Sequence, residues 1–368
     1  MRPPNSLLMP AFMALLMTLS CKKESVDNGT GGGGNTNAGV LRLTLSSQTV
    51  EMNGYDYVDI VVKDGNGTDV TASCSIFLND TESISNNFVP TALGTFKVTA
   101  KKGGTVSDEK TLTVVARTAS PFPQRALVED VTGAWCGYCT RVAWKLENYV
   151  AANPRCIVVG IHGGGTDPFN FQYYPTYNTQ FNITGYPSAI VNRRRKWTEN
   201  NSELDMALQQ WAPVGLSITS AASGSNITGT VKVKFNVTTL RPMRLVVALV
   251  ENGLVHPQVN YYSPQYGATP YLYGGVSPIN DFVHKSVLRR TATDLFGDAI
   301  PQKEIVKNSE YSFAFNMPVS GNVYGGAAYS ANPAKSAIVA FVVDASSANE
   351  GALNTQYAEV GKTVGFTN

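Results

Sequence analysis

Two cysteines separated by two residues, Cys136-Gly137-Tyr138-Cys139, constrain the fold of this chain more than any other feature. A strand-like run, Arg125 to Val131, precedes them, and apolar residues at helical spacing follow them. The unsatisfied N–H groups and the dipole at a helix start lower the pKa of a thiol placed there. This placement predicts a thiol–disulfide exchange site in which Cys136 attacks and Cys139 resolves the mixed disulfide.

The two thiols are expected to differ in access. Cys136 should lie at the helix N-terminus and be the more exposed, whereas Cys139 should be shielded one turn into the helix. Asp130, in the preceding strand, takes or gives a proton near Cys139 if it is buried, because burial raises the pKa of a carboxyl group. The alternative is a solvated acid at the end of the strand.

The N-terminus is typical of an exported lipoprotein. Arg2 precedes a short apolar run from Leu7 to Leu19, which ends in Ser20-Cys21. Residues 1–21 therefore resemble a lipoprotein signal peptide with Cys21 as the lipidated residue, the alternative being an ordinary signal cleaved elsewhere.

Residues 22–38 predict a flexible Gly-rich tether, which would let the lipid anchor hold the folded part at a membrane. No later run in the sequence is long and apolar enough for a transmembrane helix.

Composition limits the class of partner. The chain has 368 residues, which suits two or three domains, and a formal net charge of +2 with only 15% charged residues. This balance argues against nucleic acid as a partner.

Residues 39–117 predict a small all-β domain. Leu41, Leu43 and Leu45 alternate with polar residues, and residues 64–67 (Asp-Gly-Asn-Gly) predict a hairpin turn. This segment resembles bacterial immunoglobulin-like spacer domains, which implies a β-sandwich.

Residues 118–213 predict an α/β domain. A helix should follow the two cysteines and stop at Asn153-Pro154, and the continuous apolar run 156–161 is typical of a buried parallel strand. A further strand is expected over residues 185–193 and a closing helix over residues 202–212.

Residues 214–368 return to β patterning and predict a second β-sandwich. Val231, Val233 and Phe235 alternate with polar residues, and Leu245 to Val250 is a continuous apolar strand. A long irregular insertion is expected between Pro257 and Phe282.

The middle segment resembles the thioredoxin superfamily. Trp135 directly precedes the cysteine pair, and Gly185-Tyr186-Pro187 resembles the cis-proline loop that faces the two sulfurs in that fold. Pro187 lacks an N–H, and a cis bond would leave the Tyr186 backbone free to dock an extended substrate. Trp135 and Tyr186 would form an apolar rim, or else be ordinary surface aromatics.

A narrower resemblance covers most of residues 120–368. The runs 129–139 and 186–192 are similar to those of outer-membrane-protein-28-related lipoproteins of Bacteroidetes-type bacteria. The resemblance implies a cell-envelope location as an outer membrane lipoprotein, facing either the periplasm or the surface, with the immunoglobulin-like part as an added module.

Other polar residues point to no separate chemistry. Cys136, Cys139, Cys156 and His162 include zinc-ligand types, but a second closely spaced pair is missing, so we predict no metal and no cofactor. The basic run 193–196 predicts a solvated hairpin, the alternative being a surface that steers acidic partners or lipid headgroups.

The sequence therefore predicts a membrane-anchored oxidoreductase or isomerase that acts on extracytoplasmic protein thiols or disulfides. The alternative is a non-enzymatic surface binding protein in which Cys136–Cys139 is structural and the β domains bind a ligand. The C-terminal domain, with its Tyr-rich insertion, is a candidate surface for a glycan or protein ligand.

Overall fold

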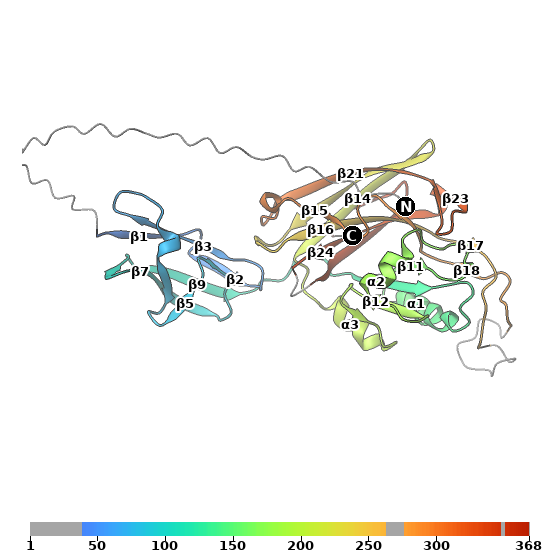
Figure 1. Cartoon of the computed structure of the whole chain (residues 1–368), viewed down its shortest axis with the longest axis horizontal. Coiled ribbons are helices and arrows are strands. Elements are labelled where there is room, and N and C mark those ends of the chain that lie inside the picture. The colour runs from blue at the N-terminus through green and yellow to red at the C-terminus, as the bar shows by residue number, and fades with distance from the viewer. Residues whose placement is uncertain (1–38, 263–275, 347–349, 368) are drawn as a thin grey trace, which may run out of the picture.

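The structure, a computed structural model, describes residues 39–262, 276–346 and 350–367. In this part the chain is a mostly β, multidomain protein with few helices (Figure 1). None of the helices in these ranges is long and apolar enough to cross a membrane. The predicted lipidation site Cys21 and the tether 22–38 lie outside the described residues.

The N-terminal part consists of two sheets that share one apolar core. A three-stranded sheet has the order β1-β3-β6, and a six-stranded sheet has the order β2-β9-β7-β4-β5 with β8 paired to β7. Alternating residues of both sheets, such as Leu43, Ile60, Val98 and Leu112, fill the space between them. The strands are β1 (Leu41–Leu45), β2 (Thr49–Met52), β3 (Val58–Asp64), β4 (Ser75–Leu78), β5 (Glu82–Ile84), β6 (Asn87–Phe88), β7 (Gly94–Lys102), β8 (Thr105–Val106) and β9 (Lys110–Ala116).

A nine-stranded sheet organises the rest of the chain. Its order is β13-β12-β10-β11-β19-β16-β24-β25, with β20 paired to β16. The sheet takes strands from both sides of residue 213, so the predicted middle and C-terminal segments share it. Its strands are β10 (Ala126–Thr132), β11 (Cys156–His162), β12 (Ser188–Val191), β13 (Arg195–Lys196), β16 (Met243–Glu251), β19 (Val287–Thr291), β20 (Asp298–Ala299), β24 (Ser336–Asp344) and β25 (Gly351–Glu359).

Three helices lie beside β11 and β12 of this sheet (Figure 1). α1 (Cys139–Ala152) and α3 (Asn201–Leu208) bury Leu146 and Leu204 in one core with Ala126 and Val128 of β10. α2 (Tyr174–Gln180) buries Tyr177 on the opposite face. The sequence predicted α1 and α3 but not α2, whose short Tyr-rich turn has no amphipathic period.

The C-terminal half adds a second layer. A four-stranded sheet with the order β21-β15-β14-β26 packs against one face of the large sheet. Leu245, Val247 and Leu249 of β16 face this layer, whereas Val246 and Val250 face the opposite core. The continuous apolar strand predicted there is confirmed. The remaining strands are β14 (Val214–Ser223), β15 (Asn226–Phe235), β17 (Leu254–Val255), β18 (Val283–His284), β21 (Glu310–Pro318), β22 (Ser320–Asn322), β23 (Ala328–Ser330) and β26 (Thr363–Val364).

The sequence predicted a solvated hairpin for the basic run 193–196. Only part of this run is exposed to solvent. Arg194, Arg195 and Lys196 are exposed, but Arg193 is buried and forms an ion pair of 2.9 Å with the buried Glu129 of β10. Its guanidinium also donates to the carbonyl oxygen of Leu295. Sequence patterning missed this pair because the partner carboxylate lies 64 residues away.

Breaking this buried pair should destabilise the fold. We expect Arg193→Ala to lower the free energy of unfolding by about 3–5 kcal/mol, because Glu129 would be left charged and unpaired in the core. The exposed neighbour provides the control, and Arg195→Ala should change stability by less than about 0.5 kcal/mol. Urea unfolding of both variants checks this, and equal effects would contradict it.

Candidate functional site

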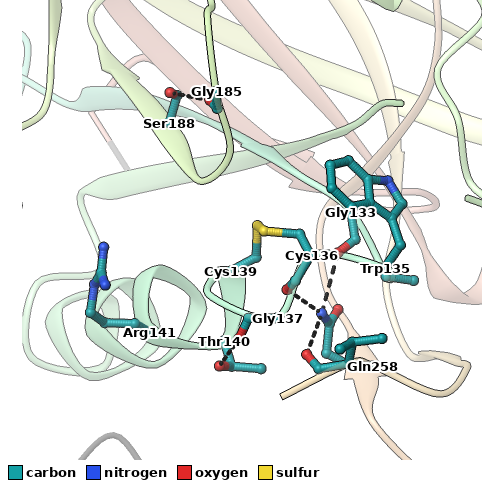
Figure 2. The surroundings of a disulfide bond; sticks show 12 residues. Gly133, Trp135, Cys136, Gly137, Cys139, Thr140, Arg141, Gly185, Ser188 and Gln258 are labelled. Carbon is teal, nitrogen blue, oxygen red and sulfur yellow. Dashed lines mark hydrogen bonds between the residues drawn. A yellow bond between two sulfur atoms is a disulfide. The ribbon is translucent and has the colours of Figure 1, made fainter. Parts of the chain in front are cut away.

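Cys136 and Cys139 form a disulfide between the end of β10 and the start of α1, with an S–S distance of 2.03 Å (Figure 2). Both residues are buried, with exposed fractions of 4% and 2%. Cys136 is the more exposed of the two, as expected from the sequence, but only by this small margin. The reason is a distant segment that packs on the loop.

The helix also begins later than the sequence suggested. Cys139 is the first residue of α1, and Cys136 lies in the turn before it. The amide of Cys136 donates to the carbonyl of Gly133 (2.9 Å), and the amide of Cys139 donates to the carbonyl of Cys136 (3.1 Å). The positive end of the helix dipole consequently lies nearest Cys139.

Gln258, from the segment that follows β17, holds the disulfide loop by its side chain. Its amide nitrogen donates to the carbonyl oxygens of Cys136 (2.9 Å) and Gly133 (3.2 Å), as Figure 2 shows. The amide of the next residue, Val259, donates to the carbonyl of Ala134. We call residues 258–262 the brace.

The rest of the brace covers the loop and the first turn of α1. The amide of Tyr261 donates to the carbonyl of Gly137, and its ring lies where a Cβ at Gly137 would be, so this position requires glycine. Thr140 donates its hydroxyl to the side chain of Asn260, which is fully buried. The sequence marked this region only as part of an irregular insertion, because hydrogen bonds between side chain and backbone leave no periodic signal.

Asp130 is buried in the middle of β10, with an exposed fraction of 6%. Its Oδ1 is buried without a hydrogen-bond partner. Burial, and secondarily the negative charge of Glu199, raises the pKa of this carboxyl group to about 7. A solvated acid at the strand end, the alternative considered from sequence, does not describe this geometry.

Asp130 and Cys139 line one cavity of about 310 Å³. The apolar residues Leu146 and Val150 of α1 line it together with Phe282. His162 and His284 also line it. The third histidine of the chain, His256, packs within 6.5 Å of His284, measured between ring centroids, so all three histidines gather here.

The loop before β12 lies on the side toward which the sulfur atoms point (Figure 2). The Tyr186–Pro187 peptide bond is cis, as the sequence led us to expect. Within the described ranges, no backbone hydrogen bond involves Tyr186. The rings of Trp135 and Tyr186 lie 5.2 Å apart between centroids, so the two residues expected to form a rim are in contact.

The remaining thiols lie apart from this site. Cys74 and Cys156 are free, Cys74 being half-buried and Cys156 buried in β11. Burial raises the pKa of the Cys156 thiol to about 12, so it stays protonated. The described part of the chain contains no group of three or more His, Cys, Asp or Glu side chains arranged to hold a metal ion.

Comparison with known proteins identifies a protein family for the second half of the chain. The family model described as "Outer membrane protein Omp28" matches residues 174–364, a range that does not include the disulfide. The structure is similar to HBP35 of Porphyromonas gingivalis, at 19% identity and a TM-score of 0.47, over 67% of this chain and 77% of that one.

A second solved structure is a domain of the outer membrane lipoprotein Omp28 from Porphyromonas gingivalis. It is 17% identical with a TM-score of 0.24, over 40% of this chain and 88% of that one. No curated protein matches this chain.

The buried carboxyl group predicts a pH-dependent effect of Asp130→Asn on stability. In the folded protein the pKa of Asp130 is raised to about 7. Ionisation of this carboxyl group therefore lowers the free energy of unfolding progressively as the pH rises from about 4 to 7. Asparagine removes this cost, on the order of 4 kcal/mol when complete.

The measurement is unfolding of the oxidised protein and its Asp130→Asn variant at pH 5 and pH 8. The variant should gain stability relative to the parent between these two values. A difference that is the same at both pH values would mean that Asp130 has an ordinary pKa.

Removing the Gln258 side chain should change the redox equilibrium of the pair. Its hydrogen bonds are made to the loop in the disulfide form, so we expect Gln258→Ala to raise the reduction potential on the order of 20 mV, equivalent to about 1 kcal/mol. Glutathione titration with thiol alkylation measures this. The matched control is Val255→Ala, at an exposed position of β17, and equal potentials for the two variants would contradict a positioning role.

Proposed function

The chain belongs to the Omp28 family of outer membrane proteins, and we propose that it exchanges thiols and disulfides of extracytoplasmic proteins through Cys136 and Cys139. Family membership confirms the predicted outer membrane location. The exchange activity is our inference from the site. The observation that carries it is a disulfide at the junction of β10 and α1, with a buried, unpartnered carboxyl group at the same cavity.

Each residue has a distinct task in the proposed reaction. A substrate thiolate attacks Sγ of Cys136, the Cys136–Cys139 bond breaks, and Cys139 leaves as a thiolate. Asp130, with a pKa of about 7, is able to donate a proton to that thiolate and to accept it again in the reverse step. A second substrate thiolate then attacks the mixed disulfide and releases Cys136, so the substrate is oxidised and the pair is reduced.

The pair returns to the disulfide form by giving its two electrons to a partner disulfide, through the same steps in reverse. The free backbone of Tyr186 beside Pro187 would dock the substrate as an added strand. Trp135, 39% exposed, and Tyr186 would supply an apolar rim for the side chains of that strand.

The proposed arrangement of the whole chain is three folded domains on a lipid anchor. Residues 39–117 form an immunoglobulin-like spacer, residues 118–213 a thioredoxin-like domain and residues 214–368 a C-terminal β-sandwich domain. Cys21 carries the lipid, residues 22–38 are the tether, and the C-terminal domain has a glycan or protein ligand.

A specific observation favours a second candidate function. Both cysteines are buried and the brace closes over their loop. A structural disulfide in a non-enzymatic surface binding protein would have these properties.

The reduction potential of Cys136–Cys139 separates the two functions. We expect a value above about −250 mV, with Cys136 alkylated first after reduction, because a pair that oxidises substrate thiols has to accept their electrons readily. A value below about −300 mV with both thiols inaccessible would identify a structural disulfide.

Single substitutions provide the matched test. Cys136→Ser should abolish turnover of a reduced protein substrate and leave the fold intact. Cys139→Ser, offered a protein substrate that contains a disulfide, should accumulate a mixed disulfide through Cys136, because the Cys136 thiolate attacks that disulfide and no resolving thiol follows. In the binding protein, by contrast, Cys136→Ser would lower stability and leave ligand binding unchanged.

A further inference from the structure

The cavity beside the disulfide has an apolar body and a polar inner end. Leu146 and Val150 of α1, Val158 of β11 and Phe282 line the body, and Asp130 lies at the inner end with Cys139. Its volume of about 310 Å³ is at the lower limit of small-molecule sites. The exposed Val283 and the ion pair between Glu147 and Lys285 (3.2 Å) lie at its mouth.

The polar atoms at the inner end are hydrogen-bond acceptors. Oδ1 of Asp130 has no partner. Nε2 of His284 lies 3.2 Å from the carbonyl oxygen of His256, which only accepts, so Nε2 carries the hydrogen and Nδ1 is the acceptor. Burial above all lowers the pKa of His284 to about 4 and keeps the ring neutral.

His162 follows the same rule. Its Nδ1 lies 2.9 Å from Oδ2 of Asp167, a carboxylate that also accepts from the amides of Ala134 and Phe169. Nδ1 is therefore the donor, and in the neutral ring Nε2 is left as an acceptor. A ligand that satisfies these groups has to bring donors, and beside an unpartnered carboxyl group the best donor is a cation.

We propose that this cavity binds a small primary amine, with its ammonium group at Asp130 and its apolar body between α1 and Phe282. The amine supplies the partner that Asp130 lacks, and its hydrocarbon part covers the apolar walls. Binding of this kind does not depend on the exchange activity.

The test uses three probes of nearly equal shape: benzylamine, benzyl alcohol and benzoate, titrated into the oxidised full-length protein by ligand-observed NMR. We expect benzylamine to bind with a Kd on the order of 1 mM, which is reasonable for its size. At pH 8, where most Asp130 is ionised, benzyl alcohol should bind at least about tenfold more weakly and benzoate not at all, because the carboxylate of Asp130 repels an anion. Equal binding of all three probes, or of none, would overturn the proposal.

Two substitutions locate the ammonium group. Asp130→Asn is nearly isosteric and should weaken benzylamine about tenfold or more while changing benzyl alcohol little. Glu147→Gln, at the mouth, should leave benzylamine within about twofold. If Glu147→Gln removes binding and Asp130→Asn does not, the amine lies at the mouth and the proposal is wrong.

A third substitution tests the apolar body. Ala143→Phe on α1 should fill the cavity and exclude benzylamine from a protein with an unchanged circular dichroism spectrum. Retained affinity in this variant would place the probe elsewhere. The probe series and Asp130→Asn decide the question even if the larger side chain disturbs the fold.

Discussion

Within the large sheet, one short parallel contact joins β10–β13, which flank the disulfide, to the remaining strands. β11 and β19 pair only at Gly160 and Val287, where the amide of Gly160 donates to the carbonyl of Ser286 (2.8 Å). A Cβ at Gly160 would lie 3.3 Å from the carbonyl oxygen of Lys285, so a larger residue would push the strands apart. This contact determines where the chain before β19 runs, and that chain forms a wall of the cavity.

The brace depends on the same excursion of the chain. Between β16 and β19 the chain leaves the sheet and returns, and Gln258 and Ile279 pair through two backbone hydrogen bonds across the excursion. β17 and β18 pair at its base. Gln258 is therefore held by its backbone while its side chain holds the disulfide loop. A perturbation of the β11–β19 contact would consequently reach both the loop and His284, although neither lies in the contact itself.

Local sequence patterns predicted those elements whose residues are close together in the chain. The apolar runs of β11 and β16, the helical spacing after the cysteine pair and the alternation in β15 are local patterns, and each of these elements formed. The contact of Trp135 with Tyr186 was expected because the cysteine pair and the cis-proline loop face each other in the superfamily that the sequence resembles.

The features that were missed are interactions between distant residues. Gln258 lies 122 residues after Cys136, and Arg193 lies 64 residues after Glu129. Their pairing depends on tertiary packing, which no local period encodes. The burial of Cys136 was not predicted for the same reason, since the residues that cover it belong to the brace, which is distant in the sequence.

Only one of the two halves of the candidate site lies within the residues that match the family model. The disulfide loop precedes the residues that match the Omp28 family model, whereas the brace, His284 and Phe282 lie within them. Membership in the family alone therefore does not bring the cysteine pair with it. The side-chain amide of Gln258 donates to carbonyl oxygens of the loop. A relative with the brace but without the loop would therefore need other acceptors for this side chain. Brace and loop are energetically linked, and a change in one should be accompanied by a change in the other.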